Sequence, residues 1–307
     1  MQYINNKFYI EKKSVKSLAE KFNTPLYCYS FKNLKTNIQN FKKTFKSISP
    51  LICFSVKSNS NVYLLKEIKK LGLGADVVSK GELLASLKAG ISRNKIVFSG
   101  VGKTEEEIEY AIRKNILLIN SESLSEVLKI EEIAKKENKL VNIGLRLNPD
   151  TDAKTLKQIS TGKSENKFGV DEKTFIKIIN LMKKSKFIRI KCLSVHIGSQ
   201  ILNHKPYEKM LGVLDKLLKR LKYKFDIIDL GGGMGISYEK NNRKLNYNEY
   251  KKSIIKFRRK HNCKIIFEPG RSIIGNVGII ITKVIYLKHN KSKTFVILDA
   301  AMNDLIR

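Results

Sequence analysis

Short strand-like runs alternate with helix-like patterns between residues 31 and 275, and this alternation limits the folds open to the chain. Parallel strands that each follow a helix build either a closed (β/α)8 barrel or an open doubly wound sheet. A barrel of this kind typically takes about 250 residues. The runs lie near 51–56, 74–78, 95–98, 116–119, 140–147, 190–196, 226–230 and 264–267.

The number of runs and the end of the first one favour the barrel. An open doubly wound sheet usually has fewer strands and a glycine-rich first turn. Here the first run ends in Lys57-Ser58-Asn59 instead. We therefore predict an α/β protein with a (β/α)8 barrel, in which the first strand lies beside the eighth.

Residues outside the barrel are predicted to form a partial β-domain. Residues 1–30 contain strand-like runs near 7–11 and 26–29, and residues 276–307 contain such runs at 277–286 and 294–298. Because two or three strands make a poor sheet alone, we expect the strands of the two segments to join. The division predicted is 1–30, 31–275 for a cofactor-binding barrel, and 276–307 for the start of an incomplete domain.

Composition narrows the class of protein. The formal charge is +32, from 60 Lys+Arg against 28 Asp+Glu, but the lysines are spread along the chain without an aromatic RNA-binding motif. A nucleic-acid binder is therefore the least favoured alternative. No apolar run approaches the ~20 residues of a membrane span, and the four cysteines show no CxxC spacing. We expect a cytoplasmic protein without a metal ion.

The ends of four predicted strands carry residues that would meet at one rim of the barrel, where the chemistry of such barrels takes place. A lysine ends the first strand, a histidine the sixth and a glutamate the eighth. Glycines after the seventh and eighth strands allow backbone N–H groups to approach a phosphate. The residues are Lys57, His196, Gly231, Gly232, Gly233, Glu268, Gly270 and Arg271.

An amine, a phosphate-binding turn, a flat imidazole and a carboxylate on one rim together indicate pyridoxal phosphate. Lys57 would bind the cofactor covalently, Glu268 would keep its pyridine nitrogen protonated, and His196 would stack on its ring. A protonated ring withdraws electrons, which suits loss of CO2 from an amino acid. The ordinary alternatives are a solvated lysine, a core histidine and a glutamate paired with a surface lysine.

The chain also resembles the diaminopimelate decarboxylase family, within the fold-type III pyridoxal-phosphate enzymes. The resemblance runs along essentially the whole sequence. Its segments are FSVKSN (54–59), GLGADVVSKGEL (72–83), RLNPDTDAKTLKQISTGKSENKFG (146–169), HIGSQI (196–201), LGGGMGI (230–236), EPGRSIIGNVG (268–278) and DAAMNDLIR (299–307).

The resemblance implies decarboxylation of meso-2,6-diaminopimelate to L-lysine by a homodimer, and the same roles for Lys57, His196 and Glu268. It implies that the glycines and Arg271 hold the phosphate and that Asp76 supports the site near the lysine. It further implies that Arg271 and Arg307 hold substrate carboxylates. Decarboxylases of ornithine, arginine or carboxynorspermidine, and a non-catalytic cofactor-binding fragment, are the alternatives.

One departure from the family concerns the region after Arg307. The family continues with a tyrosine, a Cys-Glu-Ser-Gly-Asp segment whose cysteine acts as an acid across the dimer interface, and a final tyrosine. This sequence contains none of them. We expect a truncated chain in which cofactor binding survives better than turnover.

Overall fold

The computed structural model describes residues 1–307 except 154, 156–159, 164, 239–244 and 306–307. By their contacts, residues 1–38 and 274–307 form one compact unit, and residues 39–273 form a second. Among the residues described, no helix combines the length and the apolar character needed to cross a membrane.

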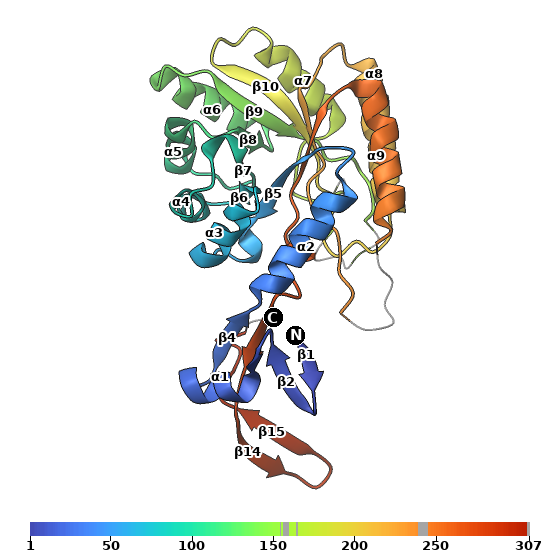
Figure 1. Cartoon of the computed structure of the whole chain (residues 1–307). Coiled ribbons are helices and arrows are strands. Elements are labelled where there is room, and N and C mark those ends of the chain that lie inside the picture. Colours follow the sequence, from blue (N-terminus) through green and yellow to red (C-terminus); the bar gives the residue numbers. More distant parts are fainter. Residues whose placement is uncertain (154, 156–159, 164, 239–244, 306–307) are drawn as a thin grey trace. The chain divides into compact units, whose positions relative to one another are not determined.

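The larger unit contains a closed barrel of parallel strands (Figure 1), as the alternation predicted. Closure occurs where β12 pairs with β5, with Ile266 opposite Leu51 and Phe267 opposite Ile52. The order around the barrel is β5 (Leu51–Ser55), β6 (Gly74–Val77), β7 (Ile96–Phe98), β8 (Leu118–Ser121), β9 (Val141–Arg146), β10 (Ile188–Ser194), β11 (Ile227–Asp229) and β12 (Lys264–Phe267).

Helices connect the barrel strands and cover their outer faces (Figure 1). Their apolar residues recur at helical spacing, as Ile108, Ala111 and Ile112 do in α5, and these residues are buried. The connecting helices are α3 (Val62–Lys70), α4 (Lys80–Lys88), α5 (Glu105–Lys114), α6 (Leu124–Lys136), α7 (Glu172–Met182), α8 (Lys205–Arg220) and α9 (Tyr247–His261); α2 (Phe31–Thr44) precedes the first barrel strand and α10 (Arg271–Ile274) follows the last.

The smaller unit joins strands from both ends of the chain. β4 (Leu26–Tyr29) pairs antiparallel with β13 (Gly278–Ile281), which is the association expected of the two segments. β1 (Gln2–Ile4), β2 (Lys7–Ile10) and β3 (Lys13–Ser14) form a second small sheet, and α1 (Val15–Phe22) follows it. β14 (Val284–His289) and β15 (Thr294–Leu298) form a hairpin.

The strand-like run at 277–286 contains two strands, β13 and β14, which Thr282 and Lys283 separate. Asp299 holds Lys283: its backbone N–H donates to the carbonyl of Lys283, and its Oδ1 accepts from the Lys283 N–H over 2.8 Å.

Candidate active site

The barrel interior consists of an apolar layer with a polar layer above it. Each apolar residue of the lower layer is followed two positions later by a polar one. Because residues two positions apart on a strand face the same side, these polar residues also face the interior. The lower layer contains Cys53, Val97, Leu118, Cys192, Ile227 and Ile266. The corresponding upper residues are Ser55, Ser99, Asn120, Ser194, Asp229 and Glu268.

A cavity of about 350 Å³ lies at this polar end of the barrel. Its lining includes four of the predicted site residues, Lys57, Asp76, His196 and Glu268. The volume falls at the lower end of the range of about 300–1,000 Å³ typical of small-molecule sites. The barrel therefore brings together side chains from the ends of its first, second, sixth and eighth strands.

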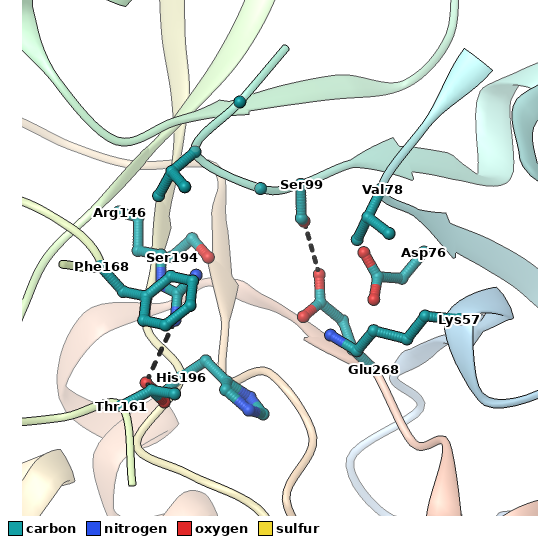
Figure 2. A pocket seen from close by; sticks show the side chains of 13 residues that line it. Lys57, Asp76, Val78, Ser99, Arg146, Thr161, Phe168, Ser194, His196 and Glu268 are labelled. Atoms are coloured by element: carbon teal, nitrogen blue, oxygen red, sulfur yellow. Dashed lines mark hydrogen bonds between the residues drawn. The ribbon is translucent and has the colours of Figure 1, made fainter. Parts of the chain in front are cut away.

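Lys57 lies one turn beyond its strand. β5 ends at Ser55, and Lys57 sits in the 3-10 turn Val56–Ser58, which Ser58 closes by donating its hydroxyl to the Ser55 carbonyl. Figure 2 shows the Lys57 and Glu268 side chains pointing toward each other, with Asp76 beside them. The lysine amine is thus placed among carboxyl groups inside the cavity.

Asp76 is buried, and only one of its two carboxylate oxygens has a hydrogen-bond partner among the described residues. Its Oδ2 accepts a hydrogen bond from Ser55 Oγ over 2.8 Å, and only 1% of the residue is exposed. Its Oδ1 is buried without a hydrogen-bond partner among the described residues. A buried carboxylate oxygen without a partner is costly unless a charged or donating group comes to it. Asp76 therefore fits a support for the Lys57 amine or for a bound ligand.

Three buried carboxyl groups share this end of the barrel: Asp76, Asp229 and Glu268. Burial raises the pKa of all three, and it raises that of Asp229 to about 6. Asp229 also raises the pKa of Glu268, through its charge and through the hydrogen bond that the two share. The crowding of buried carboxyl groups therefore disfavours the carboxylate form of Glu268.

His196 is held as a neutral imidazole. Its Nδ1 accepts the backbone N–H of Gly232 over 3.1 Å, which leaves the ring proton on Nε2. Burial lowers its pKa well below the ordinary value, and the positive charges of Arg146 and Lys57 lower it further. An uncharged, fixed ring is suited to packing against a flat aromatic ligand.

The predicted glycines pack the ends of β11 and β12 against the site. A Cβ on Gly231, where φ is +63°, would lie 2.7 Å from His196 Nδ1. A Cβ on Gly232 would lie 2.1 Å from the Glu268 carbonyl oxygen, and one on Gly270 would lie 3.2 Å from Ser58 Oγ. These glycines are required by close packing beside the cavity, and their contact with a phosphate stays a prediction, as it does for Gly233.

The two arginines assigned to the substrate differ in what the structure shows of them. Arg271 begins α10 and donates its Nη1 to the Tyr238 hydroxyl over 2.6 Å, with its guanidinium 5.8 Å from that ring. The described residues that line the cavity do not include Arg271. Arg307 lies outside the described residues.

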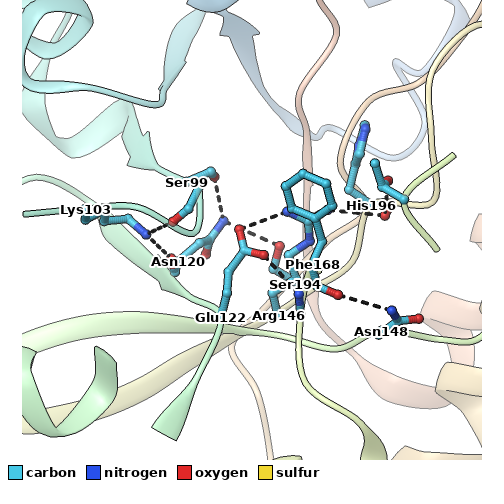
Figure 3. A network of polar contacts seen from close by, with 12 residues as sticks. Ser99, Lys103, Asn120, Glu122, Arg146, Asn148, Phe168, Ser194 and His196 are labelled. Carbon is cyan, nitrogen blue, oxygen red and sulfur yellow. Dashed lines mark hydrogen bonds and ion pairs between the residues drawn. The ribbon is translucent and has the colours of Figure 1, made fainter. Parts of the chain in front are cut away.

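Sequence reasoning missed several residues of the site. Arg146 on β9 lines the cavity, donates to Glu122 Oε1 over 2.9 Å, and stacks 4.9 Å above the Phe168 ring. Ser99 and Ser194 also line the cavity, and both accept hydrogen bonds from Nδ2 of Asn120 (Figure 3). The available signal was the period of two, which places a polar residue two positions after an inward apolar one in strand after strand.

The residues present fit pyridoxal phosphate. The cavity offers an amine at Lys57, an unpartnered acceptor on Asp76, a carboxyl of raised pKa at Glu268 and an imidazole of lowered pKa at His196. The backbone N–H groups of Gly231 and Gly232 already donate to Asp229 Oδ1 and His196 Nδ1, so these two glycines fit the site by packing beside it, and their contact with a phosphate stays a prediction. Within the described part of the chain, His, Cys, Asp and Glu form no group of three or more that could hold a metal ion.

Comparisons with known proteins agree with this geometry. Residues 31–275 match the family model described as pyridoxal-dependent decarboxylase, pyridoxal binding domain. Diaminopimelate decarboxylase of Aquifex aeolicus is 43% identical over 310 residues, which cover 100% of this chain and 73% of that protein.

Solved structures give the same match. Diaminopimelate decarboxylase from Helicobacter pylori, complexed with L-lysine, is 42% identical with a TM-score of 0.91 and covers 95% of this chain and 74% of its own. The enzyme from M. jannaschii, also in complex with L-lysine, is 32% identical with a TM-score of 0.92 and covers 100% of this chain and 74% of its own.

Proposed function

We propose, because this chain belongs to the pyridoxal-dependent decarboxylases, that it converts meso-2,6-diaminopimelate to L-lysine and CO2 with pyridoxal phosphate as cofactor. The observation that carries the proposal is the joint position of Lys57, His196 and Glu268 in one cavity at the polar end of the barrel. Relatives at 42–43% identity along nearly the whole chain are diaminopimelate decarboxylases. Two of the similar structures contain L-lysine, which is the product of that reaction.

Each residue of the cavity has a task in this function. Lys57 would bind the cofactor covalently through its amine, with Asp76 beside it as the anionic support. His196 would hold the ring by stacking, and Glu268 would place its proton at the pyridine nitrogen. When bound, pyridoxal phosphate supplies an electron-withdrawing ring that accepts the electron pair left behind by departing CO2.

Phosphate and substrate carboxylates require further contacts. We assign the phosphate to Gly231, Gly232, Gly233, Gly270 and Arg271, and the substrate carboxylates to Arg271 and Arg307. The planar guanidinium fork of arginine matches a carboxylate in two hydrogen bonds. Arg271 would exchange its contact with the exposed Tyr238 for such a ligand.

The oligomeric state and the cellular compartment that we propose follow from the family. We propose a homodimer that acts in the cytoplasm on a free amino acid. The cysteines Cys28, Cys53, Cys192 and Cys263 are all unpaired thiols, which is the state expected in a reducing compartment.

Absorption spectroscopy of the purified chain with pyridoxal phosphate tests the cofactor assignment, with Lys57→Ala as the control. We expect a visible band in the wild type alone, and borohydride should fix the cofactor onto the peptide that contains Lys57. A folded wild type without such a band would contradict the assignment.

CO2 release tests the substrate. We expect release from meso-2,6-diaminopimelate and much less from ornithine, arginine or carboxynorspermidine at equal concentration. Preferred turnover of one of those three would assign the chain to another branch of the family. Cofactor binding without CO2 release from any of them would leave the non-catalytic alternative.

A further inference from the structure

Asn120 connects four strand ends at the centre of the polar layer. Its Nδ2 lies 3.1 Å from Asp229 Oδ2, 3.2 Å from Ser99 Oγ and 3.4 Å from Ser194 Oγ. Ser99 in turn donates to Glu268 Oε1 over 3.4 Å, so the network reaches the cavity (Figures 2 and 3). Asn120 itself is 1% exposed and is not among the described residues that line the cavity.

The space for the Asn120 amide is provided by a glycine on the next strand. A Cβ added to Gly144 of β9 would lie 1.9 Å from Asn120 Oδ1, so any other residue at 144 would displace the amide. Oδ1 is buried and has no hydrogen-bond partner among the described residues. The amide therefore acts through its N–H groups, which point toward Asp229 and the two serines.

The backbone carbonyl of Asn120 is hydrogen-bonded, as its side-chain amide is. Lys103 Nζ, whose side chain is 1% exposed, donates to the Asn120 carbonyl over 2.7 Å and to the Gly100 carbonyl over 2.6 Å. Its third partner is Glu126 Oε1 at 2.7 Å. All three ammonium donors are thus satisfied, and the position of Asn120 is fixed from outside the barrel layer.

Asp229 receives two N–H donors, one from Asn120 on Oδ2 and one from the backbone of Gly231 on Oδ1 over 2.9 Å. Donors to a carboxylate favour its ionised form. Burial and then the charge of Asp229 raise the pKa of the neighbouring Glu268. The other titratable groups that face this pair are Lys57, Asp76, Arg146, His196, Tyr250 and the thiols of Cys53 and Cys192.

We propose that Asn120 is a positioning residue for the decarboxylation: its amide, seated against Gly144, holds Asp229 beside Glu268 and fixes the Glu268 carboxyl through Ser99. The inference rests on the proposed function and extends it to residues that do not touch the cavity. Asn120 contributes by keeping the Glu268 carboxyl correctly aimed.

Four variants test this role: Asn120→Ala, Asn120→Asp, Gly144→Ala and the double variant Asn120→Ala/Gly144→Ala. Gly212→Ala is the matched control, since a Cβ at that helical glycine meets nothing within 4 Å. The measurements are the dissociation constant of pyridoxal phosphate, the pH dependence of the bound cofactor's absorption, the free energy of unfolding, and kcat and KM.

Loss of the amide should weaken cofactor binding about tenfold, as expected for one hydrogen bond to a charged group. Asn120→Asp preserves the shape but adds a fourth carboxyl, so it should shift the pH profile of the absorption, which a purely structural role would leave unchanged. We expect kcat to fall with little change in KM. Gly144→Ala should add nothing further to Asn120→Ala, because both act on one amide.

Two results would overturn the inference. One is a folded Asn120→Asp or Asn120→Ala variant with the wild-type pH profile and dissociation constant. The other is full additivity of Asn120→Ala and Gly144→Ala in cofactor binding. If Asn120→Ala fails to fold, Gly144→Ala and Asn120→Asp give the same comparison. A wild type that binds no cofactor contradicts the proposed function and this inference with it, whereas an active wild type with indifferent variants contradicts the inference alone.

Discussion

The backbone N–H of Gly232 donates to Nδ1 of His196, and this one hydrogen bond determines which nitrogen of the ring carries the proton. It links the glycine segment after β11 to the histidine after β10. The ring thereby presents a fixed, uncharged face to the cavity. The protonation of the ring and its effect on the stability of the chain can both be measured directly.

We predict that His196 stays neutral at pH values where an exposed histidine is charged. Its pKa is lowered, so the unfolded chain binds a proton more readily than the folded chain below the unfolded value of about 6.5. The stability that the neutral His196 ring contributes is therefore fully present above the unfolded pKa, and it is lost as the pH falls toward the folded pKa. Nitrogen NMR of labelled histidine should show Nε2 protonated and Nδ1 bare at pH 6; a doubly protonated ring there would contradict the assignment.

Gly231→Ala should displace the same ring. The added Cβ would lie 2.7 Å from His196 Nδ1, and the φ of +63° is unfavourable for alanine. We expect a loss of roughly 1–3 kcal/mol in the free energy of unfolding, together with weaker cofactor binding. Denaturant titration beside Gly212→Ala measures the difference, and equal stability of the two variants would show that the ring tolerates the methyl group.

Glu268→Gln should raise the free energy of unfolding while abolishing decarboxylation. The folded pKa of Glu268 is raised, so the folded chain binds more protons than the unfolded chain once the pH exceeds the unfolded value of about 4.3. Stability of the cofactor-free wild type should therefore fall as pH rises through this window. The neutral amide removes that penalty, and we expect about 1–3 kcal/mol of added stability at pH 7 with loss of decarboxylation. A wild-type rate in this variant would exclude the assigned role.

Glu122→Gln should destabilise the chain without touching the cavity. Glu122 accepts from Arg146 Nη1 on one oxygen and from the Gly169 N–H on the other, and its side chain is 2% exposed. Removing the charge leaves Arg146 buried without its anion, which typically costs about 3–5 kcal/mol. Thermal and denaturant unfolding measure the loss, and Glu132→Gln, at an exposed ion pair, is the control with a change below about 1 kcal/mol.

Arg271→Lys should reduce ligand binding while leaving stability nearly unchanged. The contact of Arg271 with Tyr238 is at the surface, and lysine cannot reproduce the guanidinium fork. We expect KM or the cofactor dissociation constant to rise about tenfold or more, with an unfolding free energy within about 0.5 kcal/mol of wild type. Unchanged binding of both ligands would remove Arg271 from the site.

The barrel and three residues of the cavity, Lys57, His196 and Glu268, could be predicted because each carries a local signal, whereas Asp76 followed only from the resemblance to the family. Alternating strand and helix patterns predict the barrel, and a lysine or glutamate at the end of an apolar run is unusual enough to notice. Ser99, Asn120 and Asp229 are short polar residues at strand ends, where a helix cap or turn is the more common reading. Only closure of the barrel shows that they meet in one layer.

The positions at which strands begin and end explain the other residues of the site that the sequence did not predict. The predicted runs differ from the observed strands by one or two residues at several ends, and a shift of one residue reverses the side to which a residue points. The period of two shows that Asn120 and Arg146 point inward only once the observed strands fix which apolar residues face the interior. Partners across the barrel, such as Gly144 for Asn120, come from a different strand and leave no mark on the local pattern.

The stacked apolar and polar layers have a genetic consequence. Insertion or deletion of a single residue inside a barrel strand would exchange inward and outward residues from that point to the end of the strand. At β8 the same slip would carry Leu118 out of the core and Asn120 away from Asp229. The same alternation along a strand thus places both the core residues and the polar residues of the cavity. Insertions and deletions that preserve packing or chemistry are therefore confined to the loops between strands and helices.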